Sequence, residues 1–122
     1  MEIFFRNKKL EQSLTEDKSI IKTYGALSRK IKQRIVKLRA ANELSTIAKI
    51  PVLRLHPYKG NRTGEWSIDI QENWRICFEI NHDPIPVSDD GGIKLEQVTA
   101  IKIISPKLSD LKKKITLSIR KF

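Results

Sequence analysis

The sequence predicts a single α+β domain in which N-terminal helices pack on a small sheet. Residues 66–80 alternate between apolar and polar side chains with a period of two, as half-buried strands do. Residues 18–41 repeat apolar side chains every three or four positions, as an amphipathic helix does. With 122 residues, the chain has room for one domain with a modest core.

The N-terminal part is predicted to begin with a short strand over residues 2–6 and a helical turn or two over 8–14. A long helix over 18–41 follows, and its outer face carries mostly Lys and Arg. Gly25 interrupts the pattern, so two shorter helices are an alternative. The basic face is typical either of RNA or ribosome contact or of an ordinary solvated helix. A short helical segment over 42–50 ends at Pro51.

A strand is expected next over residues 52–56, with Leu53 and Leu55 pointing inward. Its outward side chains, Arg54 and His56, then lie on the open face of the sheet. The following stretch from Pro57 to Gly64 is rich in turn residues.

Residues 66–80 form the predicted central hairpin, with residues 71–73 as its loop. This loop places Ile70 opposite Trp74, Asp69 opposite Arg75, and Ser67 opposite Cys77. The face that carries Trp66 and Trp74 is apolar, so both indoles are assigned to the core. Arg75 falls on the open face, together with Arg54 and His56. Cys77 lies there too, but it has no obvious base beside it and is interpreted as a small structural residue.

The C-terminal third begins with a Pro-, Asp- and Gly-rich loop over 82–92. Residues 93–104 are apolar on both sides and predict an interior strand. We expect the domain to span residues 1–104 and the remaining residues, 105–122, to form a basic extension. A helix is predicted over 107–114, and the rest of the extension fits either a helix or a strand.

The net charge of the chain is +10, and it is unevenly distributed. Residues 1–50 contain 12 Lys/Arg against 5 Asp/Glu, residues 51–104 contain 6 against 8, and residues 105–122 contain 6 against 1. A chain this basic is attracted to polyanions. The charge therefore favours a nucleic-acid partner over an acidic protein.

Composition also argues against several other classes of protein. No apolar run approaches the roughly 18 residues needed to span a bilayer, and Arg6, Lys8 and Lys9 interrupt the apolar start that a signal peptide needs. Cys77 is the one cysteine, so no internal disulfide can form. We expect a cytoplasmic protein that needs no metal or other cofactor, since no metal-ligand spacing is present.

The central stretch contains a distinctive series of residues: Leu55-His56-Pro57, Lys59-Gly60, Arg62, Gly64, Trp66-Ser67, Asn73-Trp74-Arg75 and Phe78. In these residues the chain resembles the HigB ("plasmid maintenance killer") branch of the RelE/ParE toxin superfamily, over about residues 1–104. The resemblance implies a compact RelE-like fold with an antiparallel sheet. It also implies a type II toxin that cleaves mRNA on the ribosome. A HigA-like helix-turn-helix antitoxin would neutralise it, and the toxin would meet DNA only through that complex.

The resemblance further implies the site residues. Metal-free RNA cleavage uses the neighbouring 2′-hydroxyl as nucleophile, and a histidine suits the proton transfers. His56 is then the acid/base candidate, Lys59 a cation for the transition state or a base, and Arg75 the ligand of the scissile phosphate. The candidate contacts to the RNA backbone are Arg54, Arg62, Lys102 and Lys107.

Each of the three catalytic candidates also has a structural alternative. His56 could simply end a strand, Lys59 could be a solvated turn residue, and Arg75 could form a cross-strand ion pair with Asp69.

One departure from the family pattern bears on activity. Members usually end the last strand with an acidic residue, Tyr and His, whereas residues 104–107 here are Ile-Ser-Pro-Lys, and no Tyr or His follows His82. Lys102 or Lys107 could substitute, or His56 and Lys59 could suffice. A catalytically impaired toxin that only binds antitoxin, RNA or ribosome is an alternative. A ParE-like gyrase inhibitor is another, although the HPxKG-type stretch argues against it.

Overall fold

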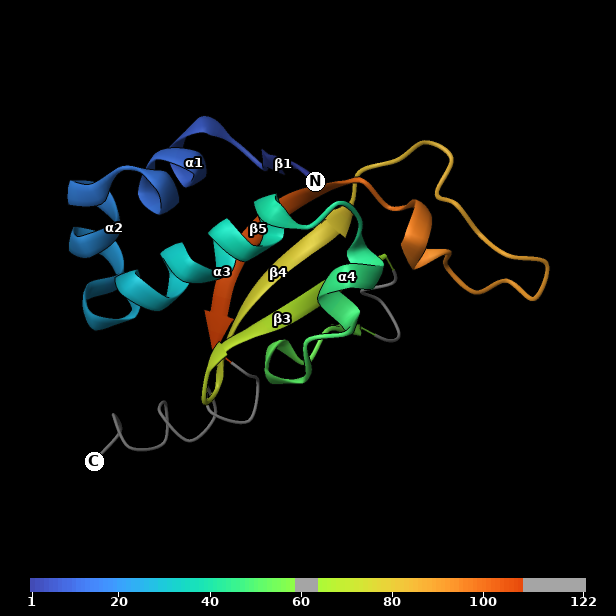
Figure 1. The fold of residues 1–122 in the computed structure, drawn as a ribbon. Coiled ribbons are helices and arrows are strands. Elements are labelled where there is room, and N and C mark those ends of the chain that lie inside the picture. Colours follow the sequence, from blue (N-terminus) through green and yellow to red (C-terminus); the bar gives the residue numbers. More distant parts are fainter. Residues whose placement is uncertain (59–63, 109–122) are drawn as a thin grey trace, which may run out of the picture.

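The computed structural model describes residues 1–58 and 64–108, and it confirms the α+β class. Helices lie on one face of a five-stranded sheet whose strand order is β1-β5-β4-β3-β2 (Figure 1). The sheet is mixed, whereas an antiparallel sheet was expected. The edge strand β1 (Glu2–Phe5) runs parallel to β5 (Ala100–Leu108), and the other neighbours are antiparallel.

The predicted long helix is divided, so the two-helix alternative is correct. After α1 (Lys8–Thr15) come α2 (Asp17–Tyr24), a 3₁₀ turn, and α3 (Ser28–Ala40). Gly25 explains the division. Its φ of 54° and ψ of −122° are allowed for glycine but not for a residue with a side chain, and they turn the chain between the two helices.

The segment before the site is a turn, so the strand predicted over 52–56 is wrong. After α4 (Leu44–Ala48), the residues Pro51–Leu53 form a 3₁₀ turn, because proline fixes the φ of a first turn. Arg54 then adopts the left-handed conformation at φ 45°. The strand β2 is therefore restricted to His56–Pro57.

The central hairpin consists of β3 (Glu65–Gln71) and β4 (Trp74–Ile80). The predicted pairs of Asp69 with Arg75 and of Ser67 with Cys77 are confirmed. The pairing of Ile70 with Trp74 is wrong, because a bulge makes Gln71 the partner of Trp74. The extra residue allows Ile70 to stay fully buried while the loop shortens to two residues.

Arg34 on α3 supports this bulge. Its Nε donates a hydrogen bond to the carbonyl of Asp69 at 2.9 Å, and its Nη2 donates to the carbonyl of Ile70 at 3.0 Å. The sequence pattern placed Arg34 on the basic outer face of the helix. Instead, its guanidinium joins α3 to the sheet.

The last strand is interior, as predicted, but its boundaries differ from those expected. Residues Leu95–Gln97 form a 3₁₀ turn, and β5 runs from Ala100 to Leu108 between β1 and β4. Residues 107 and 108 are therefore strand where a helix was predicted to begin. The remainder of that predicted helix lies outside the described residues.

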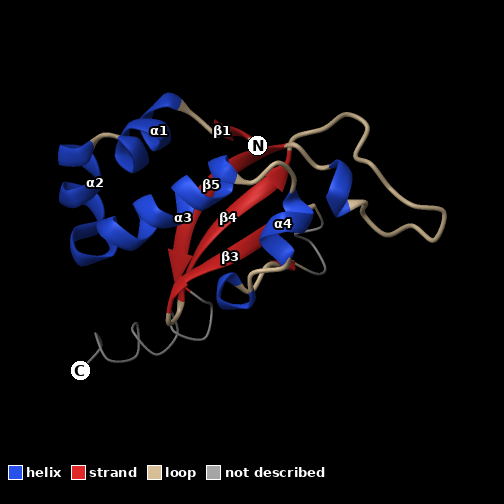
Figure 2. Cartoon of the chain, viewed as in Figure 1, coloured by secondary structure: helices blue, strands red, loops and turns tan. Residues whose placement is uncertain are grey.

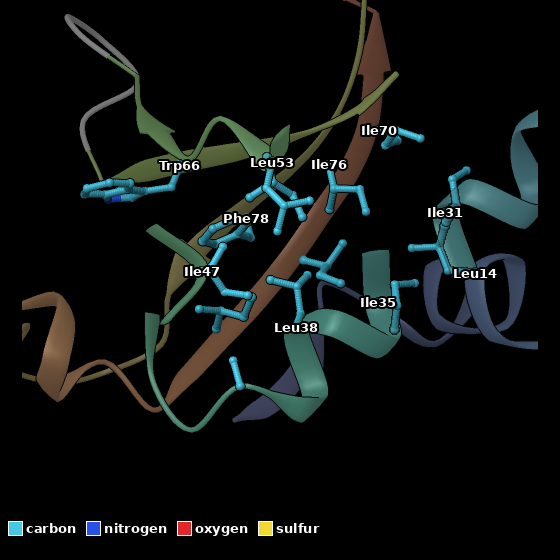
Figure 3. Close-up of a cluster of buried hydrophobic side chains, with 14 of the residues drawn as sticks. Leu14, Ile31, Ile35, Leu38, Ile47, Leu53, Trp66, Ile70, Ile76 and Phe78 are labelled. Atoms are coloured by element: carbon cyan, nitrogen blue, oxygen red, sulfur yellow. The ribbon is translucent and has the colours of Figure 1, made fainter. Parts of the chain in front are cut away.

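The core fills the space between the helices and one face of the sheet. Figure 3 shows Ile31, Ile35 and Leu38 of α3 beside Ile70, Ile76 and Phe78 of the hairpin. As predicted, Trp66 is buried and Trp74 packs against the core. Figure 2 shows helices and strands as separate layers, with the long loop after β4 projecting beyond them. In the described part of the chain, no helix has the length and apolar character that a membrane span requires.

Candidate active site

The candidate site lies on the face of the sheet that the helices leave uncovered. Side chains alternate along a strand, so Ser67 and Cys77 point away from Ile68 and Phe78, which belong to the core under the helices. His56 on β2 is the register partner of Ser67. The pairing therefore aligns His56, Ser67 and Cys77 in one row across three strands.

The ring of His56 is oriented by two hydrogen bonds. Its Nδ1 lies 2.8 Å from the carbonyl oxygen of Arg54, and its Nε2 lies 3.2 Å from Oγ of the fully buried Ser67. A carbonyl oxygen can only accept, so Nδ1 carries the proton in the neutral ring and Nε2 holds a lone pair. The left-handed backbone of Arg54 directs this carbonyl toward the ring.

Arg75 brings a fixed positive charge to that lone pair. Its Nη1 lies 3.5 Å from His56 Nε2 and 3.5 Å from the hydroxyl of Tyr58. The ion pair with Asp69, offered above as the structural alternative for Arg75, does not occur among the described side chains, because the Asp69 carboxylate turns to Arg54, with 3.6 Å between Oδ2 and Nε. A proton acceptor and a guanidinium therefore meet at one point of the open face.

Tyr58 is a site residue that the sequence analysis did not single out. Its hydroxyl lies 3.3 Å from Sγ of Cys77, and its ring centroid lies 6.1 Å from that of His56. The guanidinium carbon of Arg75 is 6.0 Å from the same ring centroid, a cation–π distance. The sequence spacing could have indicated Tyr58, because side chains two residues apart on a strand lie on the same face and Tyr58 follows His56 by two. In the structure its N–H continues the β2 pairing by donating to the carbonyl of Glu65 at 2.9 Å.

The environment of Tyr58 favours its neutral form. Partial burial and the interaction with Cys77 raise the pKa of the Tyr58 hydroxyl above its usual value of 10.0, and Arg75 opposes this shift. The hydroxyl therefore carries its proton throughout the neutral pH range and can donate it.

The other candidates are placed differently. Lys59 and Arg62 lie outside the described residues, and Arg54 is exposed beside Asp69. Lys102 is paired in register with Glu79, four residues along β4 from Arg75, which is about 13 Å at roughly 3.3 Å per residue. Lys107 is the register partner of Arg75 itself.

His82 and Cys77, the remaining histidine and the cysteine, both have contacts that fit a structural role. His82 accepts a hydrogen bond from the N–H of Thr99 at 3.0 Å. Cys77 is fully buried beneath the Tyr58 hydroxyl, in agreement with its interpretation as a small structural residue. Within residues 1–58 and 64–108, no group of three or more His, Cys, Asp or Glu is arranged to hold a metal ion.

Comparison with known proteins agrees with the fold and with the resemblance to HigB. No protein-family profile matches the chain. The endoribonuclease HigB of Proteus vulgaris is 40% identical over 55 residues, which are 44% of this chain and 59% of HigB. A crystal structure of a YafQ mutant from E. coli covers 91% of this chain and 96% of its own, with 13% identity and a TM-score of 0.53. Over those 55 residues the chain is similar to HigB, and its fold is similar to that of YafQ.

The HigB-like resemblance expected from the central motif is thereby confirmed. The match spans little more than half the length of HigB, and the likeness to YafQ is one of fold. The YoeB–YefM complex from Staphylococcus aureus is a further structural neighbour, 19% identical over 88% of this chain and 94% of its own, with a TM-score of 0.49.

Proposed function

We propose that the chain is the toxin of a type II toxin–antitoxin pair and an endoribonuclease that cleaves mRNA on the ribosome. The observation that carries this proposal is the meeting of His56 Nε2 and Arg75 Nη1 at 3.5 Å on the open face of the sheet. The core does not require this pair, since both side chains lie on the face opposite the helices. The similarity to the endoribonuclease HigB supports the same chemistry.

The reaction would proceed without a metal. His56 Nε2 accepts the proton of the RNA 2′-hydroxyl, whose oxygen attacks the adjacent phosphorus. Arg75 binds the non-bridging oxygens, where negative charge accumulates in the transition state, through its planar fork. The products are a 2′,3′-cyclic phosphate and a 5′-hydroxyl. Lys59 remains proposed as a second cation for the transition state, and Arg54, Arg62, Lys102 and Lys107 as contacts to the RNA backbone.

The substrate proposal also uses the charge of the molecule. Eight basic residues of α1, α2 and α3 are exposed: Lys8, Lys9, Lys18, Lys22, Arg29, Lys30, Lys37 and Arg39. Lys32 and Arg34 contribute less, because Lys32 pairs with Asp17 and Arg34 bonds the bulge. A surface of this kind attracts ribosomal and messenger RNA without reading sequence. The proposed protein partner is a HigA-like antitoxin that blocks the site.

The proposal is tested by inducing four versions of the chain in cells and mapping the 5′ ends of a translated mRNA by primer extension. These are the wild type, His56→Ala, His56→Ala/Lys59→Ala, and His82→Gln. His82 is the matched control because it is the only other histidine, and glutamine can still accept from Thr99. We expect discrete cuts within the reading frame for the wild type and the control only, with the His56 variants at least about 100-fold slower.

The other outcomes identify the rival functions. Growth arrest without cuts, together with altered plasmid supercoiling, would indicate a ParE-like gyrase inhibitor. An absence of cuts and of arrest would indicate a toxin homologue that only binds. Cuts of equal strength in the His56 variants would contradict the assignment of His56 as the proton acceptor.

A further inference from the structure

The proposed reaction needs a group that protonates the leaving 5′ oxygen. If His56 accepts the proton of the 2′-hydroxyl, the 5′ oxygen departs as a strongly basic alkoxide unless a second group donates a proton to it. Among the described side chains, the one hydroxyl that touches the guanidinium of Arg75 is that of Tyr58.

We infer that Tyr58 is this general acid. The inference rests on the proposed RNA cleavage and adds a catalytic residue to it. Arg75 Nη1 lies 3.5 Å from His56 Nε2 and 3.5 Å from the Tyr58 hydroxyl, so a phosphate held by Arg75 meets both groups. In-line displacement needs the attacking and leaving oxygens on opposite sides of phosphorus, which requires two separate proton-transfer groups. His56 Nε2 and the Tyr58 hydroxyl are two such groups, carried by separate rings that both approach Arg75 Nη1.

The surroundings of Tyr58 suit the donation of a proton. Partial burial and Cys77 raise the pKa of the hydroxyl, so it is protonated at neutral pH, while the neighbouring Arg75 acts in the opposite direction and favours release of the proton. Cys77 Sγ, 3.3 Å from the hydroxyl, restricts its position. The phenolate that forms after the transfer lies beside the positive charge of Arg75, which stabilises it.

The step is balanced. The bond between the 2′ oxygen and phosphorus forms while His56 Nε2 takes the 2′ proton. The bond between phosphorus and the 5′ oxygen breaks while that oxygen takes the Tyr58 proton. The enzyme is left with an imidazolium and a phenolate, and the net return of one proton from the first to the second through water restores it.

The test uses an mRNA bound in a ribosome complex, with the 5′ bridging oxygen at the cut site replaced by sulfur. A thiolate leaves readily without a proton, so cleavage of this RNA does not need a general acid. The full-length wild type, Tyr58→Phe and Tyr24→Phe are compared on the oxygen and sulfur substrates. Phenylalanine at position 58 preserves the ring beside His56 and Arg75 and removes only the hydroxyl. Tyr24 is the matched control, as the only other tyrosine.

We expect Tyr58→Phe to cleave the oxygen substrate about 100-fold more slowly than wild type, or slower still, and the sulfur substrate at nearly the wild-type rate. Tyr24→Phe should match the wild type on both. Equal slowing on both substrates would mean that Tyr58 only positions its neighbours, and no slowing would mean that it takes no part. Either result overturns the inference while the nuclease stands. If the wild type cleaves neither substrate, the proposed function itself fails.

A second variant keeps the test decisive if Tyr58→Phe does not fold. In the Tyr24→Phe chain, the remaining tyrosine can be replaced by 3-fluorotyrosine, which retains the hydroxyl and makes it more acidic. We expect the rate on the oxygen substrate to change while the rate on the sulfur substrate stays constant. An unchanged ratio of the two rates would overturn the inference.

Discussion

Asp69 lies opposite Arg75 in the hairpin register, but its carboxylate pairs with Arg54, at 3.6 Å from Nε. The guanidinium of Arg75 is thereby left beside His56 and Tyr58, without a carboxylate among the described residues to neutralise it. A site for an anionic phosphate needs such an uncompensated charge, and this arrangement provides it.

Asp69→Asn should therefore have little effect on stability or on RNA cleavage. The Arg54 side chain is 76% exposed and the Asp69 side chain 24%, and a pair of this kind contributes no more than about 1 kcal/mol to the free energy of unfolding. We expect urea denaturation to show a loss within that range and RNA cleavage to stay within about threefold of wild type. A large rise in RNA affinity would show instead that Asp69 neutralises Arg75.

Arg75→Lys should preserve the positive charge of the site but remove the planar guanidinium that can bind two phosphate oxygens. Lysine offers a point charge in place of the planar fork that fits two phosphate oxygens. We expect the cleavage rate to fall by roughly 100-fold or more, the size of effect seen when one donor to a transition-state oxyanion is removed. Unfolding by urea should stay nearly unchanged. Arg29→Lys on the exposed helix face is the control and should leave the cleavage rate unaltered.

Gly25→Ala distinguishes the observed break from a continuous helix. In an uninterrupted helix, alanine would raise the free energy of unfolding by about 1 kcal/mol. At φ 54° and ψ −122° the added Cβ is strained although no neighbouring atom lies within 4 Å, so we expect a loss of about 1–2 kcal/mol. Thermal or urea denaturation gives the sign, and stabilisation would contradict the divided helix.

The sequence predicted the parts of the fold that depend on long periodic patterns. The apolar alternation of residues 66–80 determined which faces of β3 and β4 enter the core, and the pairs of Asp69 with Arg75 and of Ser67 with Cys77 followed from it. Patterns of this length are reliable because a shift by one residue would expose a whole apolar face.

The errors arose where local backbone geometry overrides side-chain pattern. Residues 52–56 alternate like a strand, yet Pro51 initiates a 3₁₀ turn and Arg54 adopts a left-handed conformation. The same geometry places the Arg54 carbonyl on His56, a contact that no sequence pattern encodes. The family pattern does not predict Tyr58, because it places a tyrosine at the end of the last strand, whereas the tyrosine of this candidate site directly follows β2.

Arg34→Ala should destabilise the fold although the residue lies in a run of basic residues. It removes two hydrogen bonds from a charged donor to the carbonyls of the β3 bulge. We expect a loss of about 2–3 kcal/mol in the free energy of unfolding by urea. Lys37→Ala, at an exposed position of the same helix, should change stability by less than about 0.5 kcal/mol. Equal effects for the two variants would show that the contact to the bulge contributes nothing.

The basic residues after β5 should strengthen ribosome association. Residues 109–122 contain five Lys/Arg and one Asp, and neutralised phosphates release counterions that favour binding most at low salt. The strand pairing determines where to truncate, because ending the chain at residue 104 would remove the backbone partners of Cys77, Ile76, Arg75 and Trp74. We therefore expect a 1–108 chain to fold like the full chain and to cosediment less with ribosomes, with the difference shrinking as salt rises. Lys112, Lys113 and Lys114 changed together to Gln in the full-length chain should reproduce part of this loss. Equal cosedimentation of the 1–108 and full-length chains at low and high salt would show that these charges play no part.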